Sequence, residues 1–423
     1  MSDTPLWRIG FGSVCITPQE PSLLAGYSGN GRMHESVSRD IYVRTLYISH
    51  ADGTDTLLLG LDLCGVDETT VDGIRAAAAT RWGLPPEQVV INSTHNHSAP
   101  NVDTTLSLYY EHTPALDAQI AAYTAQVRQA AQDAIAAAHA AREPATLHWS
   151  QSLAGFAVNR RRSRPGCRHL PGPVDPDVPV LAARRPDGTL IGAAFAYACH
   201  TTSLCGKDLN GDYAGYACAW LEEQHPDATF LFLAGCGANQ NPLPRYRAEL
   251  SRAYGMILGQ AVDEALRGRS SELTTAPRAS RTELALPIVA STAEQLATLA
   301  ATHSPANVPG RSFRILCEQA AQGTLPTSVP YTLQALRFGT ELALVAYGGE
   351  TIVEYALHAK ARLGWETTMA LGYCDALTPY IPTAAVLDEG GYEADALYEY
   401  GYPGRLHPDT EALIHAALES LIE

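Results

Sequence analysis

A buried strand, a helix and a second buried strand follow one another between residues 57 and 91, and this order constrains the fold more than any other feature. Residues Leu57–Leu63 form an apolar run broken only by Gly60 and Asp62, which is typical of a strand covered on both faces. Glu68–Trp82 has the spacing of an amphipathic helix, and Val89–Ile91 is a short β-branched run. Strand–helix–strand order indicates an α/β unit.

The rest of the chain repeats this alternation. Asp212 is a candidate N-cap for the helix that follows it. Because no internal repeat or linker is visible, we predict a single α/β domain over residues 1–423, with mixed sheets and flanking helices. Strands are expected at Trp7–Ile16, Ile41–Ser49, Leu147–Asn159, Thr229–Leu233, Thr282–Ile288 and Met369–Tyr373, and hairpins at Val180–Ala183 with Leu190–Cys199 and at Leu333–Gly339 with Leu342–Tyr347. Helices are expected at Ala115–Ala141, Tyr213–Glu223, Arg247–Leu266, 292–322 in pieces, Asp409–Leu421, and from the segment 348–351 to about Leu363.

Charge and composition exclude several classes of partner. The net charge of -16 disfavours binding to nucleic acid or to an anionic membrane surface, since both require basic patches. One basic cluster, residues 160–164, is interpreted as a solvated loop. No apolar run approaches the roughly 20 residues that span a bilayer. We therefore expect a small-molecule substrate, with no nucleic acid and no stable membrane insertion.

The N-terminus and the cysteines bear on the compartment. The first residues contain neither a basic region nor an apolar core, so no secretory signal is predicted. The 9 cysteines show no CxxC spacing, which favours reduced thiols in a cytoplasmic protein over a disulfide framework. A homo-oligomer is left open, because acidic α/β proteins of this size are often dimers.

Two histidines directly follow the strand that ends at Ile91. His95 and His97 are separated by one residue and lie in a loop that closes at Pro100. Side chains at positions i and i+2 just past a strand can project from one rigid edge, and neutral imidazole is the commonest ligand of zinc. Alone, this pair is a weak signal, and two ordinary surface or core histidines explain it better.

Further polar residues follow other predicted strands. His200 comes after the strand that ends near Cys199, Glu350 follows the second hairpin, and Tyr380 follows the strand Met369–Tyr373. Strand ends on one edge of a sheet converge, so these side chains could share a cleft. Two histidines and a carboxylate suffice to hold a catalytic zinc with an open position for water. The competing interpretation is a set of polar strand-end caps in a binding or structural protein.

Short motifs resemble the N-terminal catalytic domain of the neutral, non-lysosomal ceramidases. THNHSAP at residues 94–100 resembles the family's THTHSGPG, and ACHTTS at 198–203 resembles FAVHGTS. VNR at 158–160, GDYAGYA at 211–217, GET at 349–351 and YIPT at 380–383 resemble NRS, GDNKGYA, PGEFTT and YITT, and YEA at 392–394 follows at the family's spacing. The motifs keep the family's order through most of the chain.

The resemblance implies an activity and a set of site residues. Members are zinc-dependent amidohydrolases that cleave the amide of N-acylsphingosine. One zinc ion would be held by His95, His200, Glu350 and Tyr380, and would activate water for attack on the carbonyl. His97 and Tyr392 would be the catalytic groups that contact the reacting oxygen or transfer a proton. Asn159 and Arg160 are assigned to binding a polar or anionic substrate group.

The chain also departs from the family pattern. Gln240 stands where the family carries a serine proposed as nucleophile, so metal-activated water is the expected nucleophile and Gln240 is assigned to substrate binding. The family's C-terminal β-sandwich domain is expected to be absent. We therefore predict a cytoplasmic zinc-dependent hydrolase of an amide bond in a small polar or amphipathic substrate. The alternatives are a metal-dependent hydrolase of carbohydrates or glycoconjugates, and a non-catalytic binding homologue.

Overall fold

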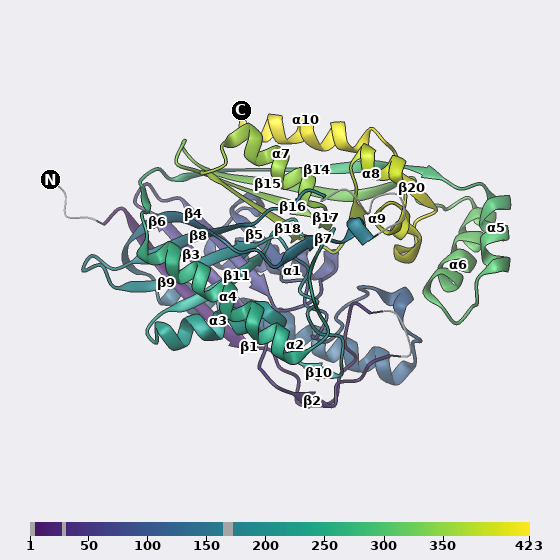
Figure 1. The fold of residues 1–423 in the computed structure, drawn as a ribbon, viewed down its shortest axis with the longest axis horizontal. Coiled ribbons are helices and arrows are strands. Elements are labelled where there is room, and N and C mark those ends of the chain that lie inside the picture. The colour runs from purple at the N-terminus through teal and green to yellow at the C-terminus, as the bar shows by residue number, and fades with distance from the viewer. Residues whose placement is uncertain (1–4, 28–30, 164–171) are drawn as a thin grey trace.

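The structure is a computed structural model that describes residues 5–27, 31–163 and 172–423. A 14-stranded sheet forms the body, in the order β11-β9-β8-β6-β1-β3-β4-β5-β18-β16-β15-β14-β20, with β13 beside β6 (Figure 1). Its strands are β1 (Trp7–Cys15), β3 (Tyr42–His50), β4 (Asp55–Leu61), β5 (Val89–Ser93), β6 (Glu143–Leu153), β8 (Asp177–Arg184), β9 (Leu190–Tyr197), β11 (Thr229–Ala234), β13 (Ser271–Leu273), β14 (Pro277–Ala290), β15 (Ser328–Phe338), β16 (Leu342–Gly348), β18 (Thr368–Cys374) and β20 (Gly404–Leu406).

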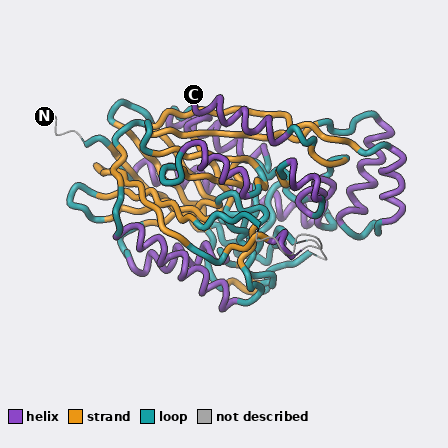
Figure 2. The backbone as a smooth tube through the Cα atoms, turned by 45° about the horizontal axis from the view of Figure 1, so that its top comes forward, coloured by secondary structure: helices purple, strands orange, loops and turns teal. Residues whose placement is uncertain are grey.

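Helices and short two-stranded ladders complete the fold. Figure 2 shows the strands running through the middle of the molecule, with helices outside them. The helices are α1 (Glu68–Trp82), α2 (Pro114–Ala140), α3 (Asp212–Gln224), α4 (Ala248–Arg267), α5 (Ala293–Thr302), α6 (Val308–Gln322), α7 (Val353–Leu363), α8 (Ala384–Glu389), α9 (Tyr392–Asp395) and α10 (Thr410–Ile422). The ladders pair β2 (Ser36–Val37) with β10 (Asp208–Leu209), β7 (Ala157–Asn159) with β12 (Gln240–Pro242), and β17 (Glu350–Thr351) with β19 (Tyr380–Ile381).

The large sheet folds over on itself into two layers. Strand β11, at one end of the strand order, packs against β3, β4 and β5 in the middle of it. Gly60 makes this approach possible, because a Cβ at that position would lie 2.6 Å from Leu231 Cδ1. Asn92 then ties the layers together: its Nδ2 donates to Gly372 O at 2.7 Å, and its Oδ1 accepts from Ala234 N at 2.8 Å.

Alternation along the strands divides the core into separate layers. In β4, Leu57, Leu59 and Leu61 join the cluster formed with α1 and α2, whereas Leu58 points into the cluster between the two sheet layers. Strand residues alternate in direction, so a strand buried on both faces needs a continuous apolar run. Helices α3, α4 and α7 cover the opposite outer face, against β8, β11 and β18.

Most predicted elements are confirmed, and the α/β fold class with them. Strands β4 and β5 pair in parallel across α1, and both expected hairpins form, as β8–β9 and β15–β16. The segment expected as one strand over 147–159 is two strands, β6 and β7. The N-cap prediction for Asp212 is wrong, because Asp212 is the first residue of α3 and its carboxylate accepts hydrogen bonds from Ser203 and Leu204.

Two findings concern the whole described chain. None of its helices combines the length and apolar character that crossing a bilayer requires. The described cysteines are all free thiols. The second finding agrees with the expected absence of a disulfide framework, while Cys167 lies outside the described residues.

Candidate active site

The loop after β5 positions the first histidine. His95 has a left-handed backbone conformation, with φ of 56°, which turns the chain sharply at the strand end. The Nδ1 of His95 lies 2.8 Å from the carbonyl oxygen of Cys64, in the loop that follows β4. A proton on Nδ1 donates to that oxygen, and the Nε2 lone pair then faces the centre of the site.

His200 is oriented in the same way from the end of β9. Its Nδ1 lies 2.9 Å from the carbonyl oxygen of Gly237, in the turn after β11. A Cβ at Gly237 would approach the backbone nitrogen of Cys199 to 2.5 Å, so only glycine allows this close passage. In both histidines Nδ1 therefore lies beside a backbone carbonyl oxygen and Nε2 is directed into the site.

Glu350 enters from the opposite side on β17. Gly349 before it has φ of 56°, and a Cβ there would collide with Thr378 Oγ1. The Tyr400 hydroxyl donates a hydrogen bond to Oε1 of Glu350. The other oxygen, Oε2, is buried and receives no hydrogen bond from any described residue.

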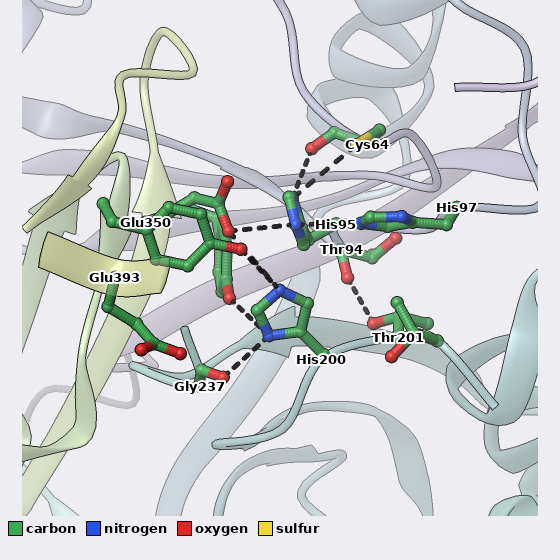
Figure 3. A network of polar contacts seen from close by, with 12 residues as sticks. Cys64, Thr94, His95, His97, His200, Thr201, Gly237, Glu350 and Glu393 are labelled. Carbon is green, nitrogen blue, oxygen red and sulfur yellow. Dashed lines mark hydrogen bonds and ion pairs between the residues drawn. The ribbon is translucent and has the colours of Figure 1, made fainter. Parts of the chain in front are cut away.

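These three side chains converge on one point (Figure 3). Oε2 of Glu350 lies 3.3 Å from Nε2 of His95 and 3.4 Å from Nε2 of His200, and all three side chains are 2% exposed. Such a cluster fits a metal ion: the donor set is two imidazoles and a carboxylate, and Oε2 is otherwise unsatisfied. The three residues are named the cradle below.

The electrostatics of the cradle favour the metal-binding forms of Glu350 and His200 but not that of His95. Burial opposes the charge on Glu350, but His95 and His200 outweigh it and hold the pKa of Glu350 well below its usual value. Burial and the neighbouring Arg160 lower the pKa of His200 to about 4. Metal binding requires a neutral imidazole and an ionised carboxylate, and His200 and Glu350 meet that requirement near neutral pH. Burial opposes a charge on His95, but Cys64 and Glu350 outweigh it and raise the pKa of His95 to about 10, so a metal ion would displace a proton from this histidine.

Tyr380 lies beside the cradle. Its hydroxyl oxygen is 3.3 Å from Nε2 of His200, and the two rings are nearly parallel. The β17–β19 ladder sets this position, because Glu350 and Tyr380 are direct partners in it. Burial raises the pKa of Tyr380 well above its usual value, so the free side chain is a neutral phenol.

His97 lies on the other side of His95 from Glu350. Its Nε2 is 3.0 Å from Nε2 of His95, and its ring meets Tyr27 edge to face. Burial and the two other histidines lower the pKa of His97 well below its usual value. Nδ1 of His97 is buried without a hydrogen-bond partner among the described residues.

Tyr392 and Arg160 lie next to each other near Tyr380. Tyr392 is 39% exposed and its ring packs edge to face on Tyr380, which is itself buried. The Arg160 guanidinium lies 5.2 Å from the centre of the Tyr380 ring and 5.4 Å from that of Tyr392. Nε of Arg160 donates to Glu393 at 2.8 Å.

The basic cluster is therefore not a solvated loop. Arg161 is 5% exposed, and its guanidinium binds Glu393 at 2.9 Å and Glu389 at 2.6 Å. Glu393 is itself fully buried and also holds Arg160, so Glu393 and Glu389 together balance two charges of this cluster. Arg164, at the end of the cluster, lies outside the described residues.

The other two residues assigned to substrate binding contact the main chain. The Asn159 amide donates to Pro173 O at 2.9 Å and accepts from Arg161 N at 3.1 Å. Gln240 donates to Ala198 O and accepts from the backbone of Asp175. Both side chains are buried, and the two residues are partners in the β7–β12 ladder. Their side chains support the loops around His200, and neither forms a hydrogen bond with the described residues of the cradle.

Four residues near the cradle were not identified from the sequence. Tyr400 binds Glu350, and Tyr373 stacks on His95 with ring centres 4.3 Å apart. The carbonyl oxygen of Cys64 holds His95, and the carboxylate of Glu393 holds Arg160. Cys64 and Tyr373 were detectable in principle, since each is at or just beyond the end of a buried strand. Tyr400 and Glu393 carry no such signal apart from the tyrosine-rich composition of the last segment.

The fold and the cradle define an α/β protein with a buried His–His–Glu candidate metal centre at the converging ends of its strands. A family model described as neutral/alkaline non-lysosomal ceramidase, N-terminal, matches residues 7–240. The chain belongs to this family. The family places it among hydrolases.

Solved structures share the fold. The neutral ceramidase from Pseudomonas aeruginosa is 18% identical, with a TM-score of 0.76, and the match covers 99% of this chain and 74% of that one. A structure titled as ceramidase complexed with C2 is 17% identical, with a TM-score of 0.75 and coverages of 99% and 75%. A search of curated proteins gave no match.

Proposed function

We propose that the protein is a zinc-dependent amidohydrolase that cleaves the N-acyl bond of a small polar or amphipathic substrate. The observation that carries the proposal is the cradle: His95, His200 and Glu350 present three ligand atoms to one point in a buried site. Family membership supports hydrolysis, and the amide is the bond that family members are named for cleaving.

The cradle residues, with Tyr380 as a fourth ligand, would hold the ion. A bound zinc would supply Lewis-acid activation of water and of the substrate carbonyl. The chain contributes orientation: Cys64 and Gly237 fix the histidine tautomers through their carbonyl oxygens, and Tyr400 fixes the carboxylate. Such supporting bonds raise the basicity and the rigidity of metal ligands.

The proposed catalytic groups are His97 and Tyr392. Neutral His97 can accept a proton at Nε2 and deliver it to the leaving amine, which is general acid–base catalysis. Tyr392 can donate from its hydroxyl to the carbonyl oxygen of the substrate once it gives up its 3.2 Å bond to Glu399. Arg160, fixed next to Tyr380 and Tyr392, would bind a polar group of the substrate there.

The test is amide hydrolysis by the purified protein. A panel of N-acylated amines, from acetyl to palmitoyl, would be assayed before and after chelation and after zinc is restored. We expect turnover that chelation abolishes, zinc restores, and Glu350→Gln removes. Hydrolysis that persists in the double variant His95→Ala/Glu350→Ala would contradict the proposal. Cleavage of glycosides but not of amides would support the carbohydrate alternative instead.

A further inference from the structure

Two arginines attach to the segment that follows His200. Arg245 donates from Nη1 to Thr202 Oγ1 at 3.3 Å, and Arg32 donates from Nη1 to Gly206 O at 2.7 Å. A second nitrogen of Arg32 donates to the backbone oxygen of His97 at 3.1 Å. Both guanidinium groups are thus fixed to the backbone or side chains of the loops that carry the site histidines.

Tyr27 connects the two arginines with His97. Its ring lies edge to face against His97, with centres 4.9 Å apart, and Arg32 stacks over the same ring at 4.5 Å. The Tyr27 hydroxyl donates to Leu204 O at 2.7 Å, two residues beyond Thr202, which binds Arg245, and Arg245 itself stacks over Tyr246. The two cations therefore lie on the His97 side of the cradle, across from Arg160 and Tyr392.

Neither arginine forms an ion pair with a described acidic residue. Arg75, by contrast, is 2.7 Å from Asp375, and Arg160 is neutralised by Glu393. Arg32 is held by carbonyl oxygens, which carry no net charge, and its buried Nε has no hydrogen-bond partner among the described residues. Two partly buried, uncompensated cations beside one site are notable in a chain of net charge -16.

We propose that Arg32 and Arg245 form an anion subsite that binds a carboxylate of the amide substrate, on the His97 side of the cradle. This inference rests on the amide hydrolysis proposed above and names the substrate class: amides that carry a carboxylate, such as N-acyl amino acids. Arg245, which donates to Thr202 alone among the described residues, keeps donors for charge-assisted hydrogen bonds to a carboxylate. Arg32, whose Nη atoms already bind carbonyl oxygens, adds its positive charge beside that group.

The subsite also fits the geometry of hydrolysis. His97, the proposed proton donor to the leaving amine, lies between the cradle and these arginines. A carboxylate a few bonds from the scissile nitrogen would then be held on the side where the amine departs. If the acyl half of the substrate carried the carboxylate, the same two arginines would bind it, and the amide would lie in the site in the reverse direction.

The test compares two isosteric ligands that differ in one charge. N-octanoylglycine carries a carboxylate, and N-octanoylglycinamide carries a neutral amide of the same shape. Binding of each ligand would be measured by calorimetry with the Glu350→Gln protein, in which turnover is suppressed. The kcat/KM for each ligand would be measured with enzyme that retains Glu350. Suberic acid mono-ethanolamide, with its carboxylate on the acyl half, shows which half of the substrate the subsite holds.

We expect the carboxylate to bind about tenfold tighter than the glycinamide, and the preference to weaken in high salt. Arg32→Gln and Arg245→Gln should each reduce the preference several-fold, and together they should remove it. Arg81→Gln is the matched control: Arg81 also stacks on an aromatic ring, that of Trp82, but lies on α1 and hydrogen-bonds Gln132. The preference should be unchanged in this control.

The outcomes separate this inference from the proposed function. Equal affinity for the two ligands, or a preference that survives in Arg32→Gln/Arg245→Gln, overturns the anion subsite. Hydrolysis of neutral amides without a carboxylate preference overturns it while amide hydrolysis stands. A preference that depends on both arginines, in a protein that cleaves no amide, supports the subsite and contradicts the hydrolase.

Discussion

Nε of Arg160 and Oε1 of Glu393 lie 2.8 Å apart, and this bond fixes a guanidinium beside the rings of Tyr380 and Tyr392. Glu393 is fully buried and the Arg160 side chain is 18% exposed, so the pair is largely withdrawn from water. Removing one partner of such a pair leaves the other uncompensated, which costs more than the pair contributes to stability.

We predict that Glu393→Gln lowers kcat/KM by about tenfold or more, because Arg160 is then free to leave the two tyrosines. Glu393→Asp, which keeps the charge but shortens the side chain, should lose less activity. Steady-state kinetics with the preferred substrate measures both variants, and circular dichroism checks that they are folded. Full activity in Glu393→Gln would contradict a positioning role.

Asn92 should be important for stability rather than for catalysis. Its amide joins β5 to the ends of β11 and β18, with every one of these groups buried. We expect Asn92→Ala to lower the free energy of unfolding by about 2–4 kcal/mol, since three buried backbone groups lose their partner. Urea unfolding measures this difference. Asn307→Ala, which removes only the N-cap of α6, should cost about 1 kcal/mol.

Gly60 tests the close packing of the two sheet layers. A Cβ there would lie 2.6 Å from Leu231 Cδ1 and 3.0 Å from the backbone oxygen of Phe232. Gly60→Ala should therefore destabilise the protein by about 1–3 kcal/mol. Gly73→Ala is the control, because Gly73 lies in α1 with open space around its Cα, and the change should stabilise by about 0.5–1 kcal/mol. Thermal unfolding of both variants decides the comparison.

The pKa of His200 makes stability depend on pH in the metal-free protein. Burial and Arg160 lower this pKa from 6.5 to about 4. Between these values the unfolded chain binds a proton that the folded protein excludes, so the contribution is fully present above pH 6.5 and is lost as the pH falls toward 4. The stability of the native protein relative to His200→Gln should therefore decrease over this range. A pH-independent difference would mean that His200 is not buried in its neutral form.

Local patterns predicted the fold well. The β4–α1–β5 unit and the two hairpins follow from periodicity and turn residues that lie within a few positions of each other. The length of a strand is harder to predict, and β14 extends over Pro277–Ala290 where only its middle was expected. That extension depends on pairing with β15 and β20, which the residues of β14 do not encode by themselves.

The candidate site was predicted for a different reason. His95, His200 and Glu350 each stand directly after a buried strand, and strand ends converge, so their meeting could be expected. Arg161 was misinterpreted because its partner Glu393 lies 232 residues away in the chain. Asn159 and Gln240 could not be separated from substrate-binding residues, since only the folded backbone shows which carbonyls and amides they satisfy. The single-domain organisation, the cytoplasmic location and the oligomeric state stay predictions.

The most direct test of the cradle is the metal content of the purified protein, measured by elemental analysis after dialysis against zinc. We predict about one zinc ion per chain, lost in His95→Ala, His200→Ala and Glu350→Gln, and retained in His225→Ala, whose histidine binds Asp263 away from the cradle. Bound zinc should also raise the unfolding temperature of the native protein but not of Glu350→Gln. A native protein that binds no zinc, or that keeps it in all three cradle variants, would contradict the account.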